Sequence, residues 1–204
     1  MGVNFGIFFV RDPVNAGNMP PAPDLAAEAQ AFAHAAHDAV GHVRKYSGEP
    51  YWVHTDEVAA IVSRVTHDPE VIAAAHLHDV LEDVAPKDAR WNEQVIAGRF
   101  GERVRQLVVE LTDVFIKENY PGLNRRERRS REIVRLAGVS AEAQTVKCAD
   151  IASNSRDIAH NDPDFGRVYL HEVETLLAKM TKADPELRKK AARAIADAWR
   201  VIRG

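Results

Sequence analysis

The chain has 204 residues, of which 46% are hydrophobic and 28% charged, and this composition excludes a disordered protein. Its formal charge of −3 gives no general positive field, so we expect no nucleic-acid partner. The single cysteine, Cys148, excludes an internal disulfide and fits a reducing compartment. The apolar runs are shorter than the roughly 20 residues of a membrane span, so we expect a cytoplasmic protein without a membrane partner.

The first part of the chain differs in composition from the rest. Residues 16–23 are rich in glycine, asparagine and proline, which is typical of a linker. The apolar segment 3–10 has no basic region before it and no cleavage site after it, which argues against a signal peptide. We therefore predict a flexible N-terminal extension over residues 1–23 and one domain over residues 24–204. The alternative for the extension is an apolar strand or helix that docks on the domain.

From Asp24, a helix-capping residue type, the pattern is helical throughout. Proline and glycine mark the breaks between helices, and a glycine-proline loop covers Lys45–Tyr51. No alternating strand pair with a hairpin turn is present. The sequence predicts an all-α, single-domain helical bundle. The expected helices are Leu25–Val40 and residues 55–66, 69–84, 92–98, 101–113, 124–137, 141–160, 164–181 and 184–203.

The expected helix 69–84 carries a cluster of ionisable residues. With about 3.6 residues per turn, His78, Asp79, Glu82 and Asp83 would share one arc and leave the opposite arc apolar. Like charges one turn apart repel, and no lysine or arginine stands between these acids. A divalent cation would remove that repulsion. The alternative is the ordinary polar face of a surface helix.

Two distant segments add candidate ligands. His54 opens a helix directly after the glycine-proline loop, where an imidazole can point into the bundle. Asp150 lies in a small, apolar run, and a buried aspartate is costly unless it is paired, protonated or bound to a metal. Lys147, Asp150 and Asn154 share a helix face, so Lys147 is an alternative, salt-bridging partner for the aspartate.

These segments resemble a known family. Residues 44–54 (RKYSGEPYWVH) are similar to the "RK-SGEPY-H" segment of the Rel/Spo-type alarmone hydrolases, which belong to the HD superfamily of metal-dependent phosphohydrolases. Residues 78–83 match its "HDxxED" motif, and residues 147–154 match its "K-x-A-D-x-x-x-N" motif. Phe100-Gly101 and the Leu111–Asp113 segment also resemble the family. The resemblance covers about residues 25–160, most of the chain.

The resemblance implies the HD fold and a hydrolase that removes the 3′-diphosphate of guanosine tetra- or pentaphosphate, giving GDP or GTP and pyrophosphate. It implies one Mn²⁺ per chain. The implied ligands are His54, His78, Asp79 and Asp150. The implied water-activating acids are Glu82 and Asp83. The implied nucleotide contacts are Arg44, Lys45, Ser47, Lys147 and Asn154, with Arg125 and Arg167 as further phosphate contacts.

Some features depart from the family pattern. Tyr46 is inserted in the basic loop, and the linker 114–123 is longer than expected. Residues 125–135 hold six arginines and two glutamates. This arginine block has three possible interpretations. It is a solvated helix face, or one of its arginines contacts the substrate's phosphates, or it contacts RNA.

The alternatives for function are an HD hydrolase of another nucleotide and a non-catalytic regulator that binds nucleotide or RNA. The other nucleotide would be an adenosine alarmone, a nicotinamide dinucleotide phosphate such as NADPH, or a deoxynucleotide. The preferred base and the oligomeric state, a homodimer included, stay open.

Overall fold

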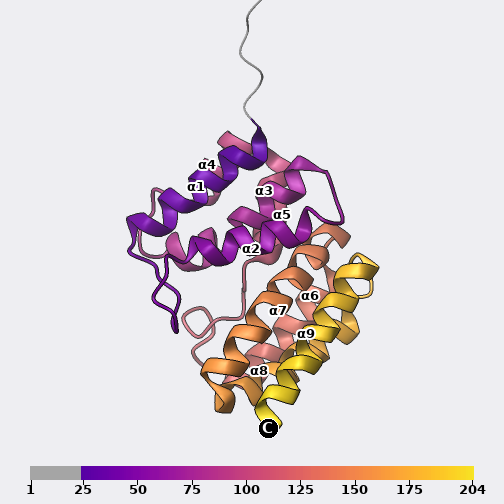
Figure 1. The fold of residues 1–204 in the computed structure, drawn as a ribbon. Coiled ribbons are helices and arrows are strands. Elements are labelled where there is room, and N and C mark those ends of the chain that lie inside the picture. Colours follow the sequence, from indigo (N-terminus) through magenta and orange to yellow (C-terminus); the bar gives the residue numbers. More distant parts are fainter. Residues whose placement is uncertain (1–23) are drawn as a thin grey trace, which may run out of the picture.

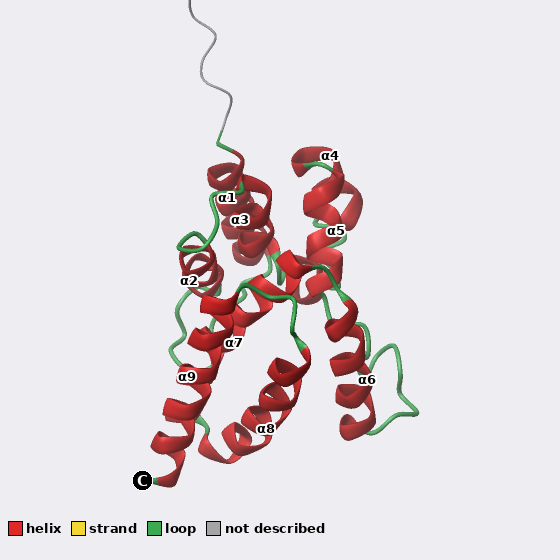
Figure 2. Ribbon diagram, turned by 90° about the vertical axis from the view of Figure 1, so that its right-hand side faces the viewer, coloured by secondary structure: helices red, strands yellow, loops and turns green. Residues whose placement is uncertain are grey.

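The computed structural model describes residues 24–204, and the predicted extension 1–23 lies outside the described residues. The described chain folds into nine α-helices and one π-helical turn, which confirms the all-α prediction (Figures 1 and 2). Its only β-type pairing is an isolated bridge between Val43 and Pro50. The elements are α1 Leu25–Ala39, α2 Trp52–Val62, α3 Pro69–Leu77, η1 Val80–Val84, α4 Glu93–Phe100, α5 Glu102–Leu111, α6 Arg125–Gly138, α7 Ala141–Asn161, α8 Pro163–Lys179 and α9 Pro185–Arg203.

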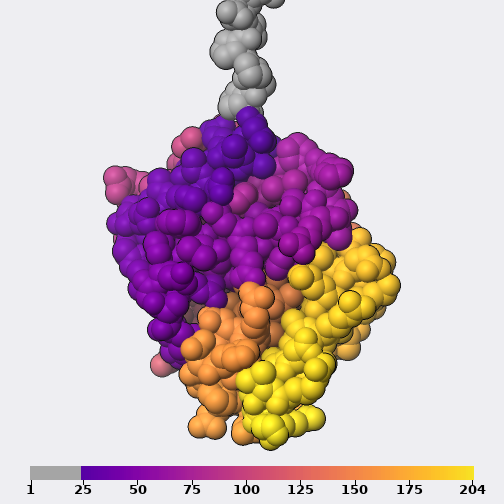
Figure 3. Space-filling model, viewed as in Figure 1, coloured from indigo at the N-terminus to yellow at the C-terminus, as the bar shows by residue number. Residues whose placement is uncertain are grey.

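The helices form two groups that meet along α7. Helices α1 to α5 lie together in the upper half of Figure 1, and α6 to α9 lie below them. Helix α7 packs against α2, α3 and α5 on one side and against α8 and α9 on the other. Its buried face is rich in small side chains, among them Ala143, Cys148, Ala149 and Ala152, which let neighbouring helices approach closely. Figure 3 shows the outer surface of this junction, where the indigo-to-magenta half meets the orange and yellow helices.

Helix starts follow the capping residues of the sequence. The side chains of Asp24, Asp68 and Asn124 each accept a hydrogen bond from a backbone amide in the first turn of the helix that follows. Proline at the first helical position opens α3, α8 and α9. These local signals explain why most predicted boundaries agree with the structure to within a few residues. Among the described helices, none is long and apolar enough to cross a membrane.

The prediction of one helix over residues 69–84 is wrong. Helix α3 ends at Leu77, and the π-helical turn η1 begins at Val80. The imidazole of His78 supplies a physical reason, because its Nδ1 donates to the carbonyl of Ala75 at 2.8 Å. An uninterrupted α-helix would offer this carbonyl to the amide of Asp79. The side chains of residues 78–83 therefore do not follow the arc expected from a regular helix.

Candidate metal centre and substrate pocket

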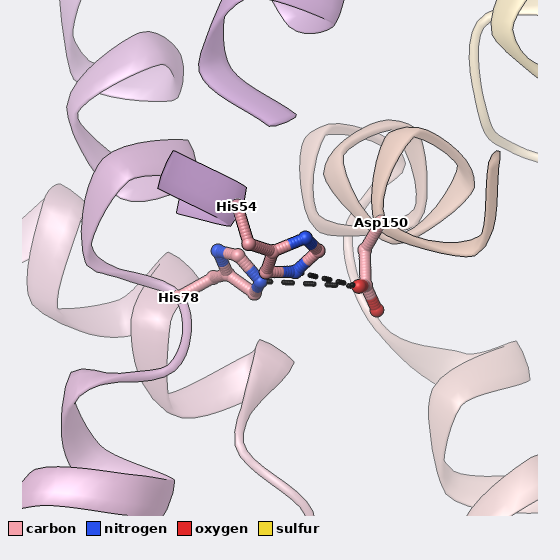
Figure 4. A group of neighbouring side chains, drawn as sticks. All are labelled: His54, His78 and Asp150. Atoms are coloured by element: carbon pink, nitrogen blue, oxygen red, sulfur yellow. Dashed lines mark ion pairs between the residues drawn. The ribbon is translucent and has the colours of Figure 1, made fainter. Parts of the chain in front are cut away.

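Two imidazoles and two carboxylates converge where α2, the end of α3 and α7 meet. Nε2 of His54 lies 3.3 Å from Oδ1 of Asp150, and Nε2 of His78 lies 4.0 Å from the same oxygen (Figure 4). Oδ2 of Asp79 lies 3.0 Å from Nε2 of His78 and 3.7 Å from Nε2 of His54. His54, His78 and Asp150 each offer a ligand atom, and these three atoms lie within 4.8 Å of one another. The structure thus brings together all four residues that the resemblance implies as ligands.

The imidazole nitrogens that face the carboxylates fit a metal ion. Nε2 of both His54 and His78 is buried and has no hydrogen-bond partner among the described residues. Because the carbonyl of Ala75 can only accept, Nδ1 of His78 carries a hydrogen, and Nε2 of the neutral ring then has a free electron pair. Burial lowers the pKa of His78, but the charges of Asp79 and Asp150 outweigh it and raise this pKa to about 9. A cation in place of that proton would satisfy the same carboxylates.

Each carboxylate of the cluster has a partner outside it. Lys147 Nζ lies 2.8 Å from Oδ2 of Asp150, and Asn154 donates to Oδ1 of Asp150 at 2.6 Å. Burial would raise the pKa of Asp150, but Lys147 and the histidines hold it well below its ordinary value. The salt bridge that the sequence left open for Lys147 is therefore present. The hydroxyl of Tyr51 donates to Oδ2 of Asp79 at 2.7 Å.

Glu82 and Asp83 form a second pair of acids, and their pKa values are shifted in the opposite direction to that of Asp150. Burial raises the pKa of Glu82 to about 7, and the negative charges of Asp113 and Asp79 add to the effect. Burial and the charge of Asp79 likewise raise the pKa of Asp83 to about 7. Oε2 of Glu82 accepts a hydrogen bond from the amide of Asp113 at 3.0 Å. Both side chains can therefore gain or lose a proton near neutral pH.

The arginine block holds the segment that carries Asp113. Arg129 donates to the Asp113 carboxylate at 2.6 Å, and Arg135 donates to the carbonyls of Glu110 and Thr112, each at 2.9 Å. The buried carboxylate of Glu132 accepts hydrogen bonds from the amides of residues 114 and 115. A solvated helix face describes only part of this helix, because its inner arginines anchor the loop beside Glu82.

The basic loop lies next to the cluster. Arg44 donates to Asp157 at 2.7 Å, and Lys45 donates to Asp162 at 3.0 Å. A cavity of about 200 Å³ opens between this loop, α7 and α8. It is lined by Arg44, Lys45, Tyr46, Tyr51, Asn154, Asp157, Ile158 and Phe165. Since Tyr51 contacts Asp79 and Asn154 contacts Asp150, the cavity adjoins the candidate metal centre.

The other predicted contacts lie further out. Arg125 lies over the ring of Phe165, 5.3 Å from its centroid, and pairs with Glu172. It therefore reaches the rim of the cavity. Ser47 is exposed and accepts a long hydrogen bond of 3.4 Å from the amide of Glu49. Arg167 is exposed on α8 and does not line the cavity.

Sequence reasoning missed several residues that contact the predicted ligands. Tyr51 belongs to the motif that carries the resemblance but was given no role, and that motif is the signal that could have found it. Ser153 and Glu57 are linked to His54 by hydrogen bonds. No local pattern marks this pair, because the two residues are 96 positions apart.

Comparison with known proteins identifies the family. The sequence profile of the HD domain family matches residues 29–202. The chain belongs to the HD domain family. A GTP pyrophosphokinase of Myxococcus xanthus is 30% identical over 153 residues, 74% of this chain and 19% of that protein. The guanosine-3′,5′-bis(diphosphate) 3′-pyrophosphohydrolase MESH1 of Drosophila melanogaster is 35% identical over 116 residues, 56% of this chain and 59% of that protein. The chain thus matches only part of the length of either curated relative.

A solved structure supports the same assignment. A metazoan ortholog of SpoT, described as hydrolysing ppGpp and acting in starvation responses, superposes with a TM-score of 0.72 at 26% identity. The match covers 88% of this HD-family chain and 98% of that one. The Listeria monocytogenes protein lmo0812 matches with a TM-score of 0.55 at 22% identity, which supports the fold alone.

Proposed function

We propose that this HD-domain protein is a manganese-dependent enzyme that removes the 3′-diphosphate of guanosine 3′,5′-bis(diphosphate) and of its 5′-triphosphate form. The observation that carries the proposal is the convergence of two imidazole nitrogens without hydrogen-bond partners and two carboxylates in one buried cluster. The activities named for the Drosophila protein and for the metazoan SpoT ortholog support the substrate class. We further propose that the enzyme acts in the cytoplasm, and a homodimer stays a prediction.

The donor set suits one divalent ion. His54, His78, Asp79 and Asp150 would hold it, and two nitrogens with two carboxylate oxygens are ligands that Mn²⁺ accepts. The bound ion would neutralise charge on the substrate's phosphates and lower the pKa of a water molecule. Lys147 and Tyr51 keep the two carboxylates oriented through their contacts to Asp150 and Asp79.

Glu82 and Asp83 handle the protons. Water attacks the phosphorus atom bonded to O3′, and the bond between that phosphorus and O3′ breaks. O3′ leaves with the nucleotide and takes a proton, and the released pyrophosphate carries the oxygen of the attacking water. One of the two side chains accepts the proton from the attacking water. The protonated form of such a group can then supply a proton to O3′. A pKa of about 7 suits a group that must do both near neutral pH.

The cavity beside the basic loop would bind the nucleoside. Arg44 and Lys45 bring two positive charges to its rim, and Phe165 provides an aromatic face. Charge-assisted hydrogen bonds from arginine suit phosphates, and an aromatic ring suits a nucleobase. Arg125, which lies over the Phe165 ring, would meet the 5′-phosphates. Lys147, Ser47 and Arg167 stay predicted contacts.

The test is hydrolysis by the purified protein. With guanosine 3′,5′-bis(diphosphate) and Mn²⁺ we expect GDP and pyrophosphate in equal amounts, and chelation of the metal should stop the reaction. Asp79→Ala should lose both bound Mn²⁺ and activity. Full metal occupancy in that variant would contradict the ligand assignment.

The same assay separates the alternatives. A panel of adenosine alarmone, NADPH and a deoxynucleoside triphosphate tests the other hydrolase readings. Faster release of product from any of these would replace the guanosine assignment. Nucleotide binding without hydrolysis of any substrate, in the presence of Mn²⁺, would instead favour the non-catalytic regulator.

A further inference from the structure

The second nitrogen of His54 is bonded to a buried side-chain pair outside the metal cluster. Nδ1 of His54 lies 3.1 Å from Oγ of Ser153, and this hydroxyl donates to Oε2 of Glu57 at 2.8 Å. His54 and Ser153 are each 1% exposed. Arg156 pairs with the other oxygen of Glu57. A chain of contacts therefore runs from the exposed Arg156 to a candidate metal ligand.

The direction of these hydrogen bonds follows from their chemistry. A carboxylate can only accept, so the hydroxyl hydrogen of Ser153 points to Glu57. The Ser153 oxygen then accepts a hydrogen from Nδ1 of His54. This leaves Nε2, the atom that faces Asp150, with a free electron pair in the neutral ring. Burial acts to raise the pKa of Glu57, but its bonds to Ser153 and Arg156 hold it below the ordinary value, so the carboxylate stays ionised at neutral pH.

We propose that Ser153 and Glu57 are positioning residues that fix His54 in the tautomer that binds the metal ion. The inference rests on the metal site of the proposed function. It distinguishes the two histidines, because His78 is fixed by the main-chain carbonyl of Ala75, which no side-chain substitution removes. His54 depends on a hydroxyl and a carboxylate, and both can be removed by substitution.

Packing alone does not require a hydroxyl at this position. The buried neighbours of Ser153 along α7 include Ala149 and Ala152, so an alanine at position 153 suits the interface in size. What the hydroxyl adds is its pair of hydrogen bonds. A loss of metal affinity in Ser153→Ala therefore reports the loss of these bonds rather than a loss of packing.

The test is calorimetric titration of Mn²⁺ into the metal-free protein. Ser153→Ala should bind Mn²⁺ about 10- to 100-fold more weakly, the usual effect of losing an outer partner of a ligand histidine. Ser153→Thr keeps a hydroxyl and should restore the affinity. Glu57→Gln should also weaken binding, because a neutral amide no longer forces the hydroxyl hydrogen away from His54. Ser155→Ala is the matched control, since Ser155 is equally buried on α7 and the hydrogen bonds to His54 and Glu57 come from Ser153 instead.

A second measurement tests the inference even if Ser153→Ala folds poorly, because it uses the parent and the other variants. The ¹⁵N shifts of the His54 ring, recorded on metal-free protein with the ring neutral, report which nitrogen carries the hydrogen. The parent and Ser153→Thr should have it on Nδ1, and Glu57→Gln should give a mixture. Wild-type Mn²⁺ affinity in Ser153→Ala, or an Nε2 hydrogen in the parent, would overturn the inference. Absence of Mn²⁺ binding by the parent would instead contradict the proposed function itself.

Discussion

Four carboxylic acids in the candidate site have different charge states because their neighbours differ. Asp150 is paired with Lys147, and Asp79 lies against His78, so these two carboxylates stay ionised. Glu82 and Asp83 are buried near negative charge, and the pKa of each is raised to about 7. This divergence of the pKa values supports the proposed division into metal ligands and proton carriers. The sequence predicted the same division only through the family resemblance.

The first prediction concerns the proton carriers. Glu82→Gln and Asp83→Asn should keep bound Mn²⁺, because neither side chain is among the four that converge at the candidate metal centre. At least one should lower kcat by ~10²-fold or more, the usual scale of general acid–base catalysis. Steady-state kinetics together with elemental analysis of the metal would check this. Parental rates in both variants would contradict the water-activating role.

The second prediction concerns Arg44. Its side chain is 11% exposed, is held by Asp157 and lines the cavity beside the metal cluster. Arg44→Ala should raise KM by the equivalent of ~1.5–3 kcal/mol, the value of a lost charge-assisted hydrogen bond, while metal content stays the same. Arg193→Ala, at an exposed position on α9, is the control and should leave KM unchanged. If KM for every nucleotide is unaltered in Arg44→Ala, the pocket lies elsewhere.

At the scale of helices, local signals predicted most of the fold. Caps and prolines such as Asp162-Pro163 and Asp184-Pro185 act within a few residues, so the sequence alone locates the starts of α8 and α9. The break after Leu77 has no such signal, because no proline or glycine stands between Pro69 and Pro86. It arises where the His78 side chain takes part in main-chain hydrogen bonding.

The contacts that complete the site were even less predictable. Tyr51 reaches Asp79 across 28 positions of sequence, and Arg44 reaches Asp157 across 113. These contacts depend on how α2, α3 and α7 pack against one another, and the periodicity of the sequence does not predict that packing. The motifs predicted the candidate ligands, and the packing of the helices decides which side chains orient them.

The third prediction concerns the arginine helix α6. Glu132 is 1% exposed and pairs with Arg135. Its carboxylate also accepts hydrogen bonds from the amides of Val114 and Phe115. Glu132→Ala would leave a partly buried arginine and two amides unpaired, and we expect a loss of about 3 kcal/mol in unfolding free energy. Glu127→Ala removes only one exposed half of the capping box and should cost about 1 kcal/mol or less. Urea unfolding would measure both. Equal losses would mean that Glu132 does not anchor the loop.

At the scale of the molecule, the candidate metal centre joins the two helix groups. His54 and His78 come from the α1–α5 group, and Asp150 comes from α7 (Figure 4). An ion bound by all three would link α2, the end of α3 and α7, so metal binding and folding should be coupled. The same junction holds Glu82 and Asp83, whose protonation also affects stability.

The last prediction concerns the pH dependence of that stability in the metal-free protein. The pKa of Glu82 is raised from 4.5 to about 7, so the folded state keeps a proton that the unfolded state releases between these values. The resulting stability is complete below the ordinary pKa and is lost as the pH rises through about 7. Glu82→Gln mimics the protonated acid and should not suffer this loss.

The measurement is therefore a difference between two proteins. Burial lowers the pKa of His37 to about 4, which makes stability rise with pH over part of the same range, so the parent's profile alone is a mixture. Subtracting the thermal midpoint of the parent from that of Glu82→Gln removes the contributions that both proteins share, such as that of His37. This difference should increase between about pH 5 and about pH 8. With Mn²⁺ present it should flatten, because a nearby cation lowers the pKa of the carboxyl. A difference that does not change with pH in the metal-free protein would mean that Glu82 titrates as an ordinary exposed acid.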